Sequence, residues 1–115
     1  MSPLSITTRE AATGLVLEVS GDLDHETVPD FRRALDGLTL RPGQLLVLDL
    51  GGMEFCDSSG INVMLVARNL ATEQGARIAL ASVPANTARI LRLVGLDRVF
   101  PLHPDASTVT ATGAG

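Results

Sequence analysis

Alternating apolar and polar positions near the start of the chain predict a strand. Leu15, Leu17 and Val19 form an apolar set that alternates with the residues between them, which is typical of a strand with one buried face. A weaker partner strand is expected over residues 3–9, joined to the first through a hairpin turn at Thr13-Gly14. The chain therefore opens with two paired strands.

A helical pattern follows residues 21–25. Apolar residues recur at helical spacing and predict one buried stripe: Val28, Phe31, Leu35 and Leu38. Thr27 and Asp30 have the spacing of a capping box, and Pro29 fits the first turn of this helix.

The run at residues 45–50 is apolar on both faces, as in a strand at the middle of a covered sheet. A second, largely buried helix is expected from Ile61 to about Gln74, where Gly75 ends it. Ile78 and Leu80 mark another strand. A third helix should open at Val83-Pro84, with its inner face formed by Ala88, Leu91 and Val94, and residues 99–102 suggest a short edge strand.

This order of elements predicts one α/β (α+β) domain over residues 1–103. We expect a mixed, partly parallel sheet of four to five strands packed with three to four helices, its later strands joined by right-handed crossovers. Residues 104–115 are poor in large apolar side chains. They are expected to form a flexible tail or a weak helix that starts near Asp105.

Charge and composition narrow the class of partner. The nine basic residues are all Arg, thirteen residues are acidic and the net charge is −4, which argues against a surface for duplex nucleic acid or for anionic membranes. Without Trp or Tyr, a stacking surface for single-stranded nucleic acid is also not expected. Proteins are the partners that this composition favours.

Residues that could hold a metal or form a disulfide are scarce. Cys56 is the only cysteine and His25 and His103 are far apart in the chain, so neither a disulfide nor a zinc site is predicted, and no cofactor is expected. The first residues lack a basic region followed by an apolar run, and no stretch approaches the ~20 apolar residues of a membrane span. We expect a cytoplasmic protein.

The segment between the central strand and the second helix carries the candidate chemistry. It reads Asp57-Ser58-Ser59-Gly60-Ile61 and places two hydroxyls at a helix start, where free N–H groups and the helix dipole favour a phosphate. The plain alternative is that Ser58 or Ser59 only caps the helix. Asp57 also suits a turn or cap, and Gly60 suits tight packing of strand against helix.

Four segments in order resemble one family, the STAS-domain anti-sigma factor antagonists, also called anti-anti-sigma factors. Residues 21–24 resemble its Gly-Glu-Leu-Asp segment, with Asp22 in place of Glu, and residues 48–50 resemble its central strand. Residues 55–61 are similar to its Phe-Met-Asp-Ser-Ser/Thr-Gly-Leu signature, and residues 94–96 to its Ser-Gly-Leu. The resemblance runs from about Leu15 to Leu102 and implies a STAS-like fold.

The resemblance also implies a function in partner switching. The unphosphorylated protein would bind an anti-sigma factor that is usually also a serine kinase, and so free a sigma factor; phosphorylation would abolish binding, and a separate phosphoserine phosphatase would reset the switch. By motif position Ser58 is the phosphoacceptor, and the protein is not an enzyme. The predicted partner-binding residues are Asp22, Asp24, His25, Asp57, Ser58, Ser59, Gly60 and Asn62.

Charge supplies a physical reason for such a switch. A phosphate on Ser58 would add about −1.5 to −2 charge to an acidic domain, beside Asp57 and near Asp24 if the two loops meet. Repulsion and desolvation would weaken binding to a docked partner, while the helix N–H groups would tolerate the phosphate within the fold. Asp24 equally suits a turn, and Asn62 stands where the family commonly has Gly.

Other functions are open at this point. A STAS module can serve as a sensor, a stressosome subunit or a subunit of a lipid-transport complex, because a fold does not determine function. A receiver-like domain is disfavoured because the chain has no Lys. A serine hydrolase is disfavoured because Ser58 lacks the Gly-x-Ser-x-Gly setting. The oligomeric state is left open between monomer and weak dimer.

Overall fold

The computed structural model describes residues 3–107, and its first two strands form the expected hairpin. Strand β1 (Ser5–Ala11) pairs antiparallel with β2 (Gly14–Leu23). The turn between them is Ala12-Thr13, one residue earlier than predicted, because Gly14 already belongs to β2 and pairs with Ala11.

Helix α1 (Val28–Asp36) packs on the sheet through Phe31 and Leu35, which are fully buried. The predicted capping box is wrong. Thr27 is the N-cap residue, but its side chain makes no capping hydrogen bond; instead its hydroxyl accepts from the Asp24 N–H at 2.9 Å and lies 2.9 Å from the Asp22 carbonyl, to which it can donate. The Thr27 hydroxyl is therefore used in hydrogen bonds within the loop before α1 and is not available to cap the helix.

The predicted central strand is confirmed and is longer than expected. Strand β3 (Leu45–Cys56) lies between β2 and β4 (Arg77–Ala81) and runs parallel to both. Its second half, from Gly51, continues beside β2 across two register shifts. Helix α2 (Ser58–Glu73) begins only two residues after β3 ends, so the serines belong to its first turn.

The chain closes with α3 (Ala85–Leu93), a 3₁₀ helix at Leu96–Arg98 and β5 (Leu102–His103), which pairs parallel with β4. Ala88 and Leu91 are buried as predicted. The prediction for Val94 is wrong, since 61% of this residue is exposed. It follows the end of α3, so the helical spacing that placed it on the inner face no longer applies there.

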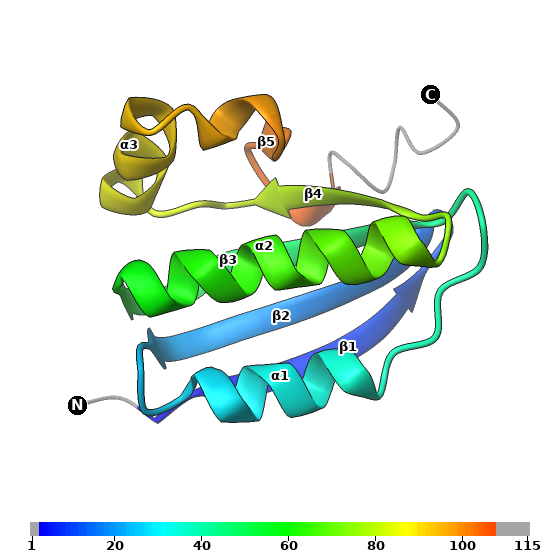
Figure 1. Cartoon of the computed structure of the whole chain (residues 1–115), viewed down its shortest axis with the longest axis horizontal. Coiled ribbons are helices and arrows are strands. Elements are labelled where there is room, and N and C mark those ends of the chain that lie inside the picture. The colour runs from blue at the N-terminus through cyan, green and yellow to red at the C-terminus, as the bar shows by residue number, and fades with distance from the viewer. Residues whose placement is uncertain (1–2, 108–115) are drawn as a thin grey trace.

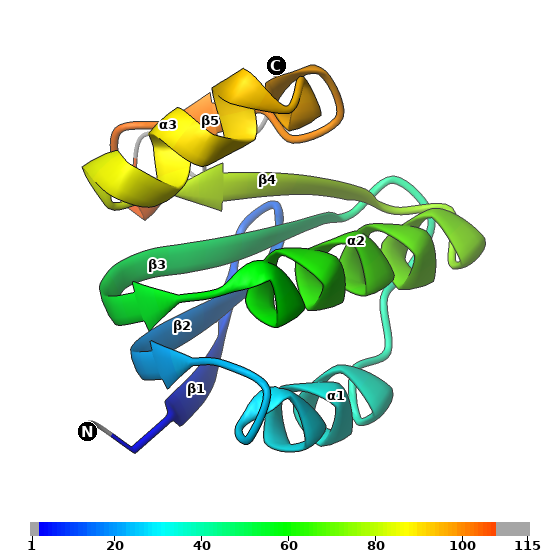
Figure 2. The same cartoon turned by 60° about the vertical axis from the view of Figure 1, so that its left-hand side comes forward.

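The strand order β1-β2-β3-β4-β5 forms one mixed sheet, and α1 and α2 lie side by side across one of its faces (Figures 1 and 2). The main core lies between these helices and the sheet. A smaller cluster joins Val16, Val47, Ala79 and Ala81 to Ala106. The mixed α/β fold is thus confirmed.

The tail prediction concerns residues 104–115, of which 108–115 lie outside the described part. Within that part, Ala106 and Ser107 are helical and Ala106 is buried. None of the helices between residues 3 and 107 has the length and apolar character needed to cross a membrane.

Candidate functional site

The side chain of Asp57 caps the start of α2. Asp57 has an extended backbone, and its Oδ1 accepts a hydrogen bond from the Gly60 N–H at 3.1 Å. The cap is therefore the aspartate and not either serine, which leaves the hydroxyls of Ser58 and Ser59 without a capping role. Both hydroxyls lie on the first turn of a sixteen-residue helix.

Asp57 also joins this turn to the loop between β2 and α1. Its Oδ2 accepts from the His25 N–H at 3.3 Å, and its own N–H donates to the Leu23 carbonyl at 3.3 Å. Residues 24–25 and 57–60 are thus brought together from segments more than thirty residues apart. The sequence places these residue types in loops but cannot show that the loops touch.

Asp24 shapes its own loop. Its Oδ1 accepts from the N–H groups of Glu26 and Thr27 at 3.0 and 3.1 Å, an Asx-type turn. The interpretation of Asp24 as a turn residue is confirmed. Asp22, two residues earlier, is half-buried near the end of β2.

The two serines differ in access. Ser58 is exposed, Ser59 is half-buried, and Asn62 is exposed one helical turn after Ser58. Because residues four apart lie on the same side of a helix, Ser58 and Asn62 present their side chains to the same region. His25 is exposed across the junction.

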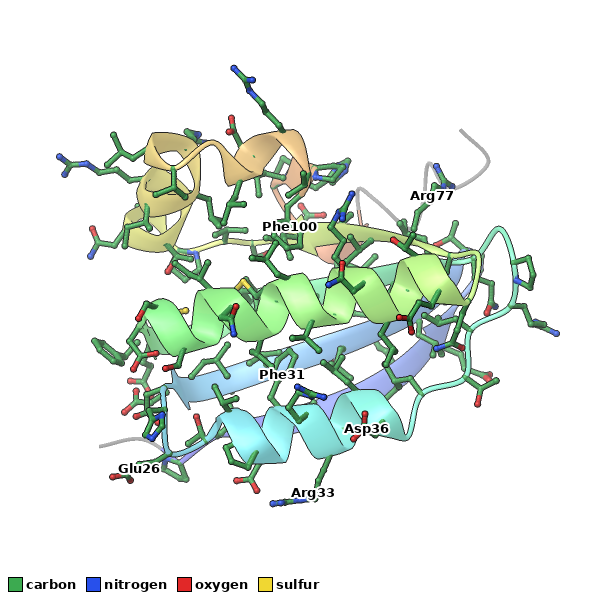
Figure 3. The ribbon with its side chains drawn as sticks, viewed as in Figure 1. Glu26, Phe31, Arg33, Asp36, Arg77 and Phe100 are labelled. Carbon is green, nitrogen blue, oxygen red and sulfur yellow. The ribbon has the colours of Figure 1, made fainter. Side chains whose placement is uncertain are left out.

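The surroundings of Ser58 are rich in carboxylates. Segments 22–27 and 54–62 contain five, from Asp22, Asp24, Glu26, Glu54 and Asp57, and neither segment contains an Arg. Glu26 lies at the end of the molecule where α2 begins (Figure 3). A further negative charge on Ser58 would be added to two segments that already carry five carboxylates. Between residues 3 and 107 there is no group of three or more His, Cys, Asp or Glu residues arranged to hold a metal ion.

Gly60 allows the start of α2 to pack closely against β2 and β3. A Cβ atom at this position would lie 2.6 Å from Cys56 Sγ and 2.8 Å from the Leu23 carbonyl oxygen. Such distances are too short for any side chain, so glycine is required by packing. The predicted role in tight strand-to-helix packing is confirmed.

The Cys56 thiol is shielded by burial. Burial, followed by the nearby charge of Asp57, raises the pKa of Cys56 from 9.0 to about 11, and the thiol lies 3.5 Å from the Asp57 carbonyl oxygen, to which it can donate. This side chain is thus held neutral at physiological pH, which fits the expectation of a small packed residue rather than a redox switch.

We expect this pKa to affect stability in alkaline solution. Below pH 9 both folded and unfolded chains keep the thiol proton. Between pH 9 and about 11 the unfolded chain loses it while the folded chain retains it, so the free energy of unfolding should fall with rising pH over that window. Urea titrations at several pH values, compared with Cys56→Ala, measure this; an equal pH slope in both proteins would contradict the assignment.

The cap predicts a second measurable effect. Asp57→Ala removes the acceptor for the Gly60 N–H and should lower the free energy of unfolding by about 1–2 kcal/mol. Asp57→Asn keeps an acceptor for the Gly60 N–H but loses the contact with the His25 N–H, and it is expected to lose less stability than Asp57→Ala. Urea denaturation of both variants checks this, and an equal loss in both would mean that the hydrogen bond to Gly60 is not what stabilises the turn.

The sequence did not indicate how Phe55 is placed. It is 53% exposed at the end of β3, directly before the capping turn. An aromatic residue in an apolar run is ordinarily assigned to the core. Its position follows from the extension of β3 past Leu50, which the apolar pattern does not show.

A mixed sheet with a helix-capping aspartate and an exposed serine after its central strand defines the class of protein. The chain belongs to the STAS domain family: the family described as "Mlab, STAS domain" matches residues 6–104. The anti-sigma factor antagonists of this family are regulatory, non-catalytic proteins.

Within that family the chain is similar to anti-sigma factor antagonists. It is 32% identical over 90 residues to the anti-sigma F factor antagonist of Paenibacillus polymyxa, covering 77% of each chain. It is 28% identical to a STAS-domain containing protein of Pseudomonas aeruginosa, covering 86% of this chain and 99% of the other. The solved structure of an anti-sigma factor antagonist from Mycobacterium paratuberculosis shares the fold, with a TM-score of 0.85 at 23% identity over 98% and 96% of the two chains.

Proposed function

We propose that this protein is an anti-sigma factor antagonist in a partner-switching pathway. Its unphosphorylated form binds an anti-sigma factor that is also a serine kinase, and thereby frees a sigma factor. Phosphorylation of Ser58 abolishes binding, and a phosphoserine phosphatase restores it. The observation that carries this proposal is the exposed Ser58 on the capped first turn of α2, in a chain 32% identical to an anti-sigma F factor antagonist.

Access and charge support Ser58 as the acceptor. Ser58 is exposed whereas Ser59 is half-buried, so a kinase reaches the Ser58 hydroxyl more readily. The N–H groups of a first helical turn lack partners within the helix, and they can receive phosphate oxygens without disturbing the fold. The surrounding segments carry five carboxylates and no Arg, so a partner docked over Ser58 would have to bury an added phosphate charge beside like charges, which weakens binding.

The surface offered to the anti-sigma factor comprises the residues gathered at the start of α2. It includes Asp22, Asp24 and His25 from the β2 end and its loop, and Asp57, Ser58, Ser59, Gly60 and Asn62 from the capping turn. In this function the protein is a substrate and not an enzyme, and it acts in the cytoplasm where RNA polymerase works.

Affinity capture with the unphosphorylated protein and with Ser58→Asp in parallel tests the proposal. We expect a kinase-type anti-sigma factor to be retained only by the unphosphorylated protein. Incubation of that partner with ATP and this chain should then add one phosphate, which peptide mass spectrometry should place at Ser58. Retention by both proteins, or phosphate only at other residues, would refute the proposal.

A second candidate is a STAS module that acts as a sensor or scaffold without a phosphorylation switch. A 28% identical relative is named only as a STAS-domain containing protein, without a sigma-factor function in its name. This second candidate predicts the same bound partners for the unphosphorylated protein and for Ser58→Asp, so the same capture experiment separates the two.

A further inference from the structure

The large apolar side chains exposed in the described part of the chain gather around α3. They are Phe55, Ile90, Leu93 and Val94, which are 53%, 40%, 75% and 61% exposed. The first three line a groove of about 620 Å³ between the end of β3 and α3. Contiguous exposed apolar surface of this kind marks sites of interaction.

The fold does not need these side chains. Helix α3 packs on the rest of the domain through Thr87, Ala88 and Leu91, and the opposite side of a helix that faces only water is normally polar. Ile90 and Leu93 are three residues apart on that opposite side, so they form a stripe along the groove. This stripe is suited to contact with a second protein.

Charges of opposite sign lie on the two sides of the groove. Arg89 lines it on the α3 side, and α3 also carries Arg92 and no acidic residue. Glu54 lines it on the β3 side, next to the carboxylates around Ser58. A complementary partner segment would be acidic opposite Arg89, apolar in the middle and basic opposite Glu54.

The groove is continuous with the Ser58 surface. Cys56 lines the groove, and the next residue along the chain is the capping Asp57. The groove therefore adjoins the capping turn along the chain, and a protein that covers the turn can extend over Phe55 toward the groove.

We propose that the groove receives an amphipathic segment of the anti-sigma factor, with apolar side chains between Phe55 and Leu93 and an acidic residue paired with Arg89. This inference rests on the proposed function for the identity of the partner. The groove lies outside the turn that carries the phosphate, so phosphorylation weakens binding at the turn and leaves the groove itself unchanged. It supplies affinity and partner choice, whereas Ser58 supplies the switch.

Leu93 and Val94 offer a matched pair of variants. Both are highly exposed apolar residues, but Leu93 lines the groove and Val94 does not. Leu93→Ser should weaken binding to the purified anti-sigma factor about tenfold or more, whereas Val94→Ser should change it less than about twofold. Calorimetric titration measures both affinities, and thermal melting of both variants checks that they remain folded.

The results for these variants test the groove proposal separately from the proposed function. Binding of Leu93→Ser at the original affinity, or an equal loss in both variants, overturns the groove proposal, while loss of binding in Ser58→Asp still upholds the proposed function. If the unmodified protein binds no anti-sigma factor, both proposals fall. Sedimentation of the chain alone adds a further outcome: self-association that Leu93→Ser abolishes would make a second copy the occupant and overturn the groove proposal.

Discussion

Ser58→Asp is expected to weaken binding to the anti-sigma factor by on the order of a hundredfold while leaving thermal stability nearly unchanged. The substitution places a carboxylate on an exposed position of the first turn of α2, among carboxylates from segments 22–27 and 54–57. Negative charge is favourable at a helix N-terminus, so the fold should accept it. A docked partner would meet an added, partly desolvated charge.

Two controls separate the switch from a general effect of charge. Ser58→Ala removes the hydroxyl without adding charge, and should bind the partner but accept no phosphate. Thr72→Asp adds the same charge at an exposed position near the other end of α2, and binding should change less than about twofold because exposed charges at that distance are screened. A comparable loss of affinity in Thr72→Asp and Ser58→Asp would contradict a local switch.

Gly60→Ala is expected to have the largest effect on stability. In an unobstructed helix this substitution would stabilise by up to about 1 kcal/mol. At Gly60 the new Cβ would lie 2.8 Å from the Leu23 backbone carbonyl and 2.6 Å from Cys56 Sγ, and the backbone atom cannot move aside as a flexible side chain would. We expect a loss of about 1–3 kcal/mol, measured by urea denaturation.

Gly37→Ala is the matched control. Gly37 follows α1 with a backbone conformation open to any residue (φ −81°), and a Cβ there would approach nothing closer than the Ala34 carbonyl oxygen at 3.7 Å. This variant should be as stable as the original protein or slightly more stable. The packing explanation for Gly60 would be wrong if both alanine variants gained stability.

Much of the fold follows from local patterns. Strand β2 and helix α1 each present a regular apolar period, α2 is apolar around most of its circumference, and the apolar run at 45–50 correctly predicts the central strand. The prediction of β3 is too short because the apolar run stops at Leu50, whereas the strand continues to Cys56. Residues 51–56 contain two glycines, a glutamate and an exposed phenylalanine, and they are held in β3 by pairing with β2 rather than by their own apolar spacing.

The sequence predicts which residues belong to the site, but it does not predict the contacts between them. The motif around Ser58 indicates a helix start that tolerates an anion, and Asp57 is one of several candidate caps. Only the fold shows that Asp57 accepts from Gly60 on one side and from the His25 N–H on the other. The groove beside α3 combines residues from β3 and α3, and no spacing within either element predicts it.

The hydrogen bond from the His25 N–H to Asp57 makes the proposed switch depend on the folded structure. The surface around Ser58 exists only when the β2–α1 loop and the start of α2 are assembled together. A fragment or an unfolded chain carries the same serine but not this surface, and is therefore expected not to bind the anti-sigma factor. Heat denaturation or proteolysis would then abolish binding even in the unphosphorylated protein.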